Sequence, residues 1–170
     1  MLTLPRIVER DAVPYVAVKR DLLPHTLGEV GPTAHDAVYT WLQQHGIPAA
    51  GPPFFRYIRI DMERGFEMEF GVPTERLVMV EDDLVAGLLP AGRYASTVYR
   101  GPYGDLLDVN AVLVGWAKER GLTWDMEQTA SGDRFACRLE IYRTDEQLVP
   151  DPAQWETEVA IRLVPSTRAD

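Results

Sequence analysis

Two short segments of this chain resemble each other and occupy the same place in a longer pattern. "W-L-Q-Q-H-G-I" (41–47) parallels "W-A-K-E-R-G-L" (116–122), and "F-E-M-E-F" (66–70) parallels "W-E-T-E-V" (155–159). Each member of the first pair closes a run of apolar residues at helical spacing, and Gly46 and Gly121 stand where such a helix would end. We interpret the chain as an internal duplication of one strand–helix–strand–strand unit.

The expected elements follow the same order in both halves. In the first half we predict strands over 15–18, 54–60 and 66–72, with a helix that starts at Pro32 and Thr33. In the second half we predict strands over 93–100, 135–143 and 155–163, with a helix after Gly101 and Pro102. The halves cover about residues 5–73 and 93–165, and residues 74–92 connect them through turns at 82–83 and 90–92.

This pattern predicts a single α+β domain over residues 1–170. One helix and about three strands per unit allow a helix to cover only one face of each small sheet. Two units related by a pseudo-twofold axis would place both helices on one side. A groove would remain between the halves, and such junctions are common ligand sites.

Composition limits the partners of the chain. The net charge is −9 and no cluster of Lys and Arg is present, so we expect no direct contact with nucleic acid. No run of about 18 apolar residues and no signal peptide are found, so no membrane span is expected. The single cysteine, Cys137, fits a reducing cytoplasm. The surface acidity is expected to keep the protein soluble more than to steer cations.

The segment "F-A-C-R-L-E-I-Y-R" (135–143) places a carboxylate inside a strand. Alternation of side chains predicts one apolar face, expected to pack against the helices, and an opposite face that holds Glu140. Glu140 is then either solvated beside Arg138 or part of the groove beside Tyr142. A partly buried carboxylate would have a raised pKa, hold a cationic ligand or polarise a water molecule. The apolar face consists of Phe135, Cys137, Leu139 and Ile141.

Other polar and aromatic residues give weaker indications. The carboxylate pairs Glu67/Glu69 and Glu156/Glu158 alternate with apolar residues, and they suit either an acid–base pair or, more commonly, a solvated sheet face. Aromatic residues near the predicted strand ends could stack on a flat or cationic molecule, although each alone is more often ordinary packing. These aromatic residues are Phe54, Phe55, Tyr57, Tyr99, Tyr103, Trp124, Tyr142 and Trp155.

No metal or cofactor site is expected. His25, His35 and His45 are ten residues apart, which is no ligand spacing, and neither CxxC nor HExxH occurs. No G-x-S-x-G nucleophile elbow and no glycine-rich phosphate loop is present. Cys137 falls on the apolar strand face, where an inert thiol is expected.

Several motifs taken in order resemble one family. They are "G-P-P-F-F-R-Y" (51–57), "F-E-M-E-F-G-V-P" (66–73), "L-P-A-G-R-Y-A-S-T-V-Y-R-G-P-Y" (89–103), "W-A-K-E-R-G-L" (116–122) and "L-E-I-Y" (139–142). Together they resemble the GyrI-like domain, the effector-binding domain of bacterial multidrug-responsive transcription regulators. The resemblance covers about residues 5–165 and implies a duplicated α+β fold with a ligand groove between its halves.

The resemblance also implies a site and several activities. It implies that Glu140 contacts lipophilic, often cationic, drug-like molecules. The aromatic walls would be Tyr142 and Trp155, joined by Phe55, Tyr57 and Tyr103. The family includes members that resemble hydrolases of cyclopropane-bearing genotoxins, and others that inhibit gyrase. The regulators carry a DNA-binding helical domain first, whereas the strand pattern here begins by about residue 7, so we expect a stand-alone member.

Three functions therefore remain open. The first is binding of lipophilic or cationic aromatic compounds, in xenobiotic resistance. The second is hydrolysis of a strained electrophile with Glu140 as the catalytic group. The third is a protein-interaction module, such as a gyrase inhibitor. A cation-binding Glu140 should stay ionised, whereas a general acid would gain from a raised pKa. Direct neutralisation of Glu140 by Arg138 would weaken the cation-binding hypothesis.

Overall fold

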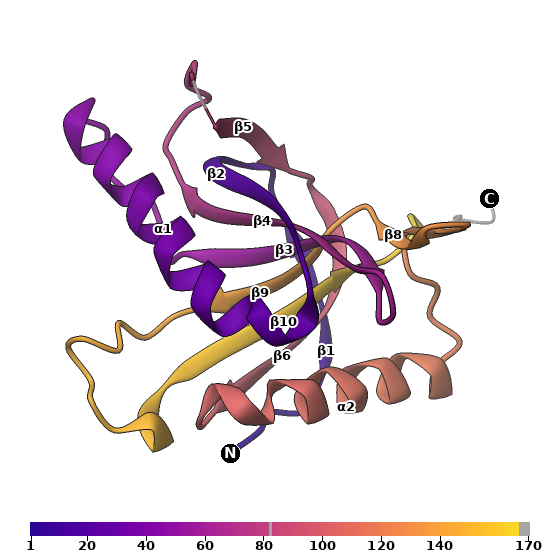
Figure 1. Cartoon of the computed structure of the whole chain (residues 1–170). Coiled ribbons are helices and arrows are strands. Elements are labelled where there is room, and N and C mark those ends of the chain that lie inside the picture. Colours follow the sequence, from indigo (N-terminus) through magenta and orange to yellow (C-terminus); the bar gives the residue numbers. More distant parts are fainter. Residues whose placement is uncertain (82, 167–170) are drawn as a thin grey trace.

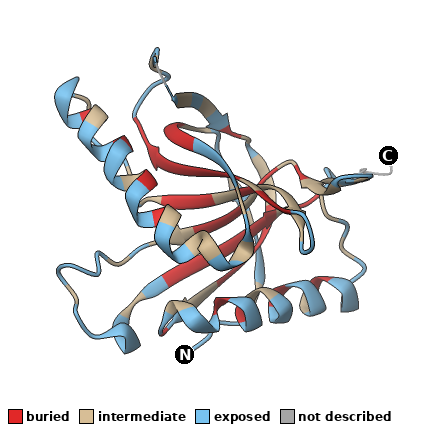
Figure 2. Cartoon of the chain, in the orientation of Figure 1, coloured by how far each residue is buried: buried red, intermediate tan, exposed pale blue. Residues whose placement is uncertain are grey.

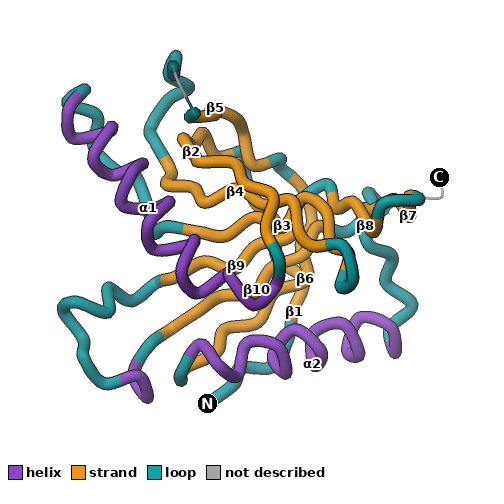
Figure 3. The backbone as a smooth tube through the Cα atoms, in the orientation of Figure 1, coloured by secondary structure: helices purple, strands orange, loops and turns teal. Residues whose placement is uncertain are grey.

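The computed structural model describes residues 1–81 and 83–166, whose sheet-dominated fold carries two α-helices (Figures 1 and 3). The α+β class is as predicted. No helix in these ranges is both long and apolar enough to cross a membrane. In chain order the elements are β1 (Arg6–Arg10), β2 (Val13–Leu22), η1 (Pro24–Thr26), α1 (Leu27–Gln44), β3 (Phe54–Asp61), β4 (Gly65–Pro73), β5 (Leu84–Leu89), β6 (Gly92–Arg100), η2 (Tyr103–Asp105), α2 (Leu106–Glu119), β7 (Met126–Thr129), β8 (Gly132–Phe135), β9 (Arg138–Tyr142), η3 (Pro152–Gln154) and β10 (Glu156–Arg162), where η marks a 3₁₀ turn.

The two similar sequence segments end the two helices in the same way. Gly46 and Gly121 both have φ of 63°, a left-handed conformation that costs glycine little. In each case the next amide bonds to the carbonyl five residues earlier, at 2.9 Å after α1 and 3.0 Å after α2. The glycine amide bonds to the carbonyl three residues earlier, at 3.2 Å and 3.0 Å. This is the Schellman arrangement, so both helix ends are confirmed where the sequence placed them.

The predicted start of the first helix is wrong, and the predicted connector holds a strand that was not predicted. The first helix starts at Leu27, after the turn that contains Pro24, and Pro32 lies inside it. A proline inside a helix removes one backbone bond, a cost that the packing of α1 offsets. The predicted connector contains the strand β5, which pairs with the edge of β2. The turn predicted at 82–83 includes residue 82, which lies outside the described residues.

All the strands form one antiparallel sheet in the order β1-β6-β10-β9-β3-β4-β2-β5, and the β7–β8 hairpin is attached to β3. The strands of the two halves pair in the same order. In the half made of β2, β3 and β4, the first strand pairs with the third and the third with the second, which gives β2–β4–β3. In the half made of β6, β9 and β10 the same rule gives β6–β10–β9. The pair β3–β9 joins the two sides and places residues 54–56 against residues 139–141.

The strand register shows that both helices cover the same face. Val159, Glu140, Phe55, Phe70 and Val18 are successive cross-strand partners from β10 to β2. At one end of this row Val159 packs with α2, and at the other end Phe70 and Val18 pack with α1. Figure 1 shows β9 and β10 running between the two helices. Glu140 therefore lies on the helix-bearing face, and the prediction that it faces away from the helices is wrong.

The predicted strand 135–143 is also broken. A bend at Ala136 separates β8 from β9. Phe135 consequently packs with α2, whereas Cys137 and Leu139 belong to a cluster on the opposite face. Alternation within β9 holds as predicted, but it does not extend across the bend.

Three apolar clusters fill the fold, and Figure 2 shows the buried residues concentrated on the central strands and on the inner sides of the helices. One cluster joins α1 to β2, β3 and β4, and a second joins α2 to β6 and β10. The third lies on the opposite face of the sheet. Tyr142 packs against both helix-side clusters, so it marks the point where they meet.

Candidate functional site

Glu140 lies between the two helices and is almost completely buried, with 6% of its surface exposed. Its Oε2 atom accepts hydrogen bonds from the hydroxyls of Tyr57 on β3, at 3.1 Å, and Tyr142 on β9, at 2.9 Å. Its Oε1 atom accepts one from Nδ2 of Asn110 on α2, at 3.0 Å. All three donors are neutral, so the carboxylate is well solvated by the protein without being neutralised.

Asn110 links Glu140 to Arg138, a half-buried cation on the same strand. Its Nδ2 also donates to the carbonyl of Leu106 at 2.9 Å, and its Oδ1 accepts from Nη2 of Arg138 at 3.0 Å. These three bonds use both amide hydrogens and the oxygen. Among the described residues Arg138 forms no ion pair with Glu140 within 4.0 Å, so direct neutralisation is not seen. Sequence reasoning missed Asn110, although an amide beside the apolar stripe of a predicted helix is an unfavourable placement that signals a special role.

Burial raises the pKa of Glu140 above its ordinary value. The hydrogen bonds from Tyr142, Tyr57 and Asn110 and the charge of Arg138 act in the opposite direction without cancelling that effect. Burial, followed by the charge of Glu140, also raises the pKa of both tyrosines well above the usual value. The two hydroxyls therefore stay protonated and remain donors to the carboxylate.

An aromatic wall extends from Glu140 through Tyr142 to Trp155. The Tyr142 ring centre lies 4.7 Å from that of Phe55 and 5.2 Å from that of Tyr103. Tyr103 in turn lies 4.5 Å from Trp155, whose indole N–H donates to the carbonyl of Val149 at 2.7 Å. The structure thus brings together all six residues that the sequence analysis named as ligand-binding. Their part in binding stays a prediction.

His35 is a further neighbour that the sequence analysis considered only as a metal ligand. Its Nε2 lies 3.0 Å from the carbonyl oxygen of Phe54, and its ring lies 5.3 Å from Phe55. Burial lowers the pKa of His35, so the ring is neutral near pH 7 and packs as an aromatic group. In residues 1–81 and 83–166 no cluster of His, Cys, Asp and Glu is arranged to hold a metal ion.

Two of the other predicted carboxylates are buried in ion pairs, so neither proposed role fits them. Glu69 accepts from Arg56 at 3.2 Å, and Glu158 is paired with Arg10 and Arg143. Both lie on the sheet face opposite Glu140. They are neither a solvated sheet face nor a free acid–base pair.

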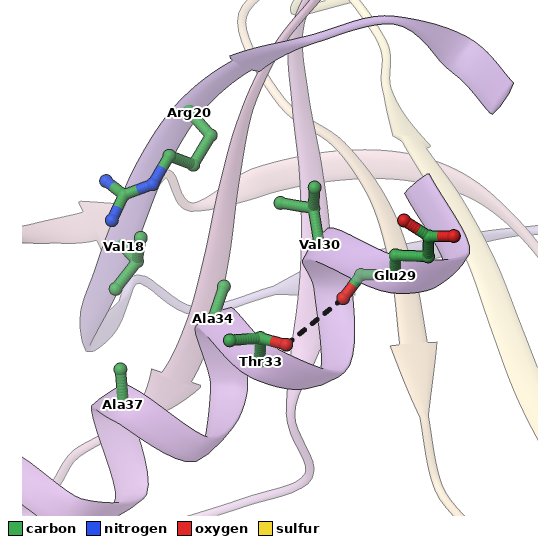
Figure 4. Close-up of a pocket in the computed structure, with 7 residues that line it drawn as sticks. All are labelled: Val18, Arg20, Glu29, Val30, Thr33, Ala34 and Ala37. Carbon is green, nitrogen blue, oxygen red and sulfur yellow. Dashed lines mark hydrogen bonds between the residues drawn. The ribbon is translucent and has the colours of Figure 1, made fainter. Parts of the chain in front are cut away.

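A surface pocket of about 600 Å³ lies directly outside Tyr142. It is bounded by α1, by the loop before β3 and by the loop after β9. A smaller pocket of about 300 Å³ lies elsewhere, between β2 and α1 (Figure 4). Val18 and Val30 line this second pocket, which contains none of the six predicted site residues. The pocket at Tyr142 is therefore the one that adjoins the candidate site.

Solved structures share this fold at low sequence identity. EcmrR in its complex with DNA has a TM-score of 0.76 and 14% identity over 96% of this chain, which spans 58% of that longer chain. SAV2435 bound to tetraphenylphosphonium has a TM-score of 0.64 and 10% identity, covering 95% of this chain and 94% of that one. A hydrolase encoded by lin2189 from Listeria innocua has a TM-score of 0.62 and 13% identity, covering 94% and 91%. Identities this low establish the fold alone.

The sequence itself matches one family. No curated protein matches it. The GyrI-like small molecule binding domain matches residues 4–164, which is nearly the whole chain and includes every element of the candidate site. The chain therefore belongs to the GyrI-like family of small-molecule-binding domains.

Proposed function

We propose that this domain binds lipophilic cations that carry aromatic groups, with Glu140 as the counter-charge. The observation that carries the proposal is that Glu140 is buried among neutral donors and has no ion partner among the described residues. A carboxylate in this setting costs free energy unless a positive charge approaches it. A bound cation would supply that charge.

The aromatic wall fits the same class of ligand. Tyr142, Tyr103 and Trp155 form a continuous set of rings that a flat or multi-ring compound can contact by stacking and by cation–π attraction. The related fold of SAV2435 was solved with tetraphenylphosphonium, which is a lipophilic aromatic cation. Such binding in the cytoplasm would suit a role in xenobiotic resistance.

The test compares tetraphenylphosphonium with the neutral triphenylphosphine oxide. We expect Glu140→Gln to lower the affinity for the cation at least about tenfold, because a partly desolvated charge pair is lost. The affinity for the neutral compound should change little. Isothermal titration calorimetry measures both affinities. The matched control is Glu156→Gln, which makes the same change at an exposed carboxylate of β10. Unchanged cation affinity in Glu140→Gln would sink the proposal.

Hydrolysis of a strained electrophile is the second candidate, and the raised pKa of Glu140 favours it. A carboxyl group whose pKa is raised keeps its proton to higher pH and is better suited to act as a general acid toward water or substrate. Incubation with a cyclopropane-bearing alkylator, followed by mass spectrometry, separates turnover from binding. Product formation that Glu140→Gln abolishes would support it, whereas uptake without product would exclude it.

We also propose that the fold arose by duplication and retains a pseudo-twofold arrangement. The shared pairing order β2–β4–β3 and β6–β10–β9 and the two matching helix ends support this proposal. The proposed relation makes Phe55 and Tyr57 of β3 equivalent in position to Glu140 and Tyr142 of β9. One half would then contribute the charge while both halves contribute tyrosine hydroxyls to it.

A further inference from the structure

The pocket outside Tyr142 carries its own charges. Asp36 and Tyr39 from α1 line one side, and Asp145 from the loop after β9 lines the other. Neither aspartate forms an ion pair among the described residues. The one cationic residue in the lining, Arg143, is bonded to Glu158 at 2.5 Å, and the two aspartates outnumber it. The pocket is therefore net negative.

The carboxylate of Asp145 affects the aromatic lining as well. Burial raises the pKa of Tyr39, and the negative charge of Asp145 raises it further. The charge of Asp145, on the loop, therefore acts on Tyr39, on α1, at the other side of the pocket. Asp145 also accepts the amide of Gln147 at 2.9 Å, which fixes the local turn and the position of the carboxylate. An asparagine would retain this acceptor.

Tyr142 connects this pocket to Glu140. Its hydroxyl donates to the buried carboxylate, while the residue also lines the surface pocket. Adjacent strand residues are about 3.4 Å apart, so Glu140 and Tyr142 are separated by roughly 7 Å along β9 and Asp145 lies no more than roughly 17 Å from Glu140. The separation between the buried carboxylate and the acidic pocket is therefore within the length of one elongated molecule.

We propose that the site prefers elongated dications, with one charged aromatic end at Glu140 and a second cationic group in the pocket formed by Asp36, Tyr39 and Asp145. This inference rests on the proposed function and names its ligand class more closely. Because Asp36 and Asp145 are exposed to water, each contributes less than the buried Glu140. The two aspartates would favour a ligand with a second positive charge over a singly charged ligand, whereas Glu140 would bind both.

The test uses two isosteric ligands. Both are triphenylphosphonium ions with a hexyl chain, which ends in trimethylammonium in one and in the neutral tert-butyl group in the other. We expect the dication to bind the wild-type protein about fivefold more tightly, because two screened carboxylates attract its second charge. The double variant Asp36→Asn/Asp145→Asn should bring the ratio of affinities close to one. High salt should reduce the ratio in the wild-type protein.

The control changes net charge by the same amount elsewhere. Asp108→Asn/Glu119→Gln removes two exposed carboxylates from α2 and should leave the preference for the dication intact. Equal affinities of the two ligands in the wild-type protein, or a preference that survives in Asp36→Asn/Asp145→Asn, would overturn this inference alone. If neither ligand binds, or if Glu140→Gln leaves both affinities unchanged, the proposed function fails and this inference fails with it.

Discussion

Glu140 and Glu158 lie on opposite faces of one sheet and are almost equally inaccessible to solvent, yet their surroundings differ. Their exposed fractions are 6% and 4%. Glu158 is paired with Arg10 and with Arg143 at 2.5 Å, and Ser96 donates to it at 2.5 Å. Glu140 has only neutral donors. Burial would raise both pKa values, but the Ser96 bond and the two arginines lower that of Glu158, whereas that of Glu140 stays raised.

This difference shows that low solvent exposure alone does not distinguish a structural carboxylate from a candidate binding group. The presence of an ion partner distinguishes them, because a carboxylate already paired with arginine within the fold attracts a cationic ligand only weakly. Among the described residues no ion partner offsets the cost of burying Glu140, and such local costs are expected at sites that serve binding.

Glu158→Gln should lower the free energy of unfolding by about 2 kcal/mol at neutral pH, because it leaves two arginines without their shared partner. Urea unfolding measures the loss. The control Glu156→Gln, on the same strand but exposed, should change it by less than about 0.5 kcal/mol. A loss as small as that of the control would mean that Glu158 is not structurally important.

Cation affinity should depend on pH through Glu140. Its folded-state pKa is raised, so below that pKa a cation must displace a proton, and affinity for tetraphenylphosphonium should fall by up to about tenfold per pH unit. Calorimetry in buffers of different ionisation enthalpy measures the proton released. Affinity that stays constant from the usual glutamate pKa to neutral pH would contradict a titrating Glu140.

Glu140→Gln should stabilise the protein by up to about 1 kcal/mol at neutral pH, opposite in sign to Glu158→Gln. In the folded state Glu140 keeps its proton to a higher pH than it does in the unfolded chain. The stability of the wild-type protein therefore falls as the pH rises from the ordinary glutamate pKa through the raised pKa of the folded state. The amide removes this loss, and the tyrosine hydroxyls can rotate to accept from it. Urea unfolding across this pH range should show the gain shrinking at low pH. Equal destabilisation by both variants would remove the contrast.

Thr157→Val should raise stability by up to about 1 kcal/mol. Thr157 lies opposite Tyr142 on β10 with 0% of its surface exposed, and within the described residues its hydroxyl has no hydrogen-bond partner. Valine has nearly the same shape and removes that unsatisfied group. Thermal unfolding measures the change, and cation affinity should stay within about twofold because the uncharged hydroxyl is not the ligand's counterpart. A clear loss of stability would mean that the hydroxyl has a partner.

The sequence predicted the residues that gather around Glu140 better than it predicted their surroundings. Glu140 and Tyr142 were placed on one strand face by alternation, and the family resemblance added Trp155, Tyr103, Tyr57 and Phe55. The sequence did not predict Asn110 as a site residue, because its contact with Glu140 spans 30 positions and depends on how α2 lies over β9. The same holds for Asp36 and Asp145, which line one pocket although 109 positions separate them. Contacts of this kind have no local pattern in the chain.

Local sequence therefore determined the secondary-structure elements, and tertiary packing determined which side chains of those elements meet. The sequence alone set the α+β class, both glycine-terminated helix ends and the alternation within β9, because each depends on neighbours within a few residues. Which sheet face the helices cover was decided only when β3 paired with β9 and both helices packed on one side. Among the described residues, that packing buried three carboxylates, placed arginines beside Glu69 and Glu158, and left Glu140 with neutral donors.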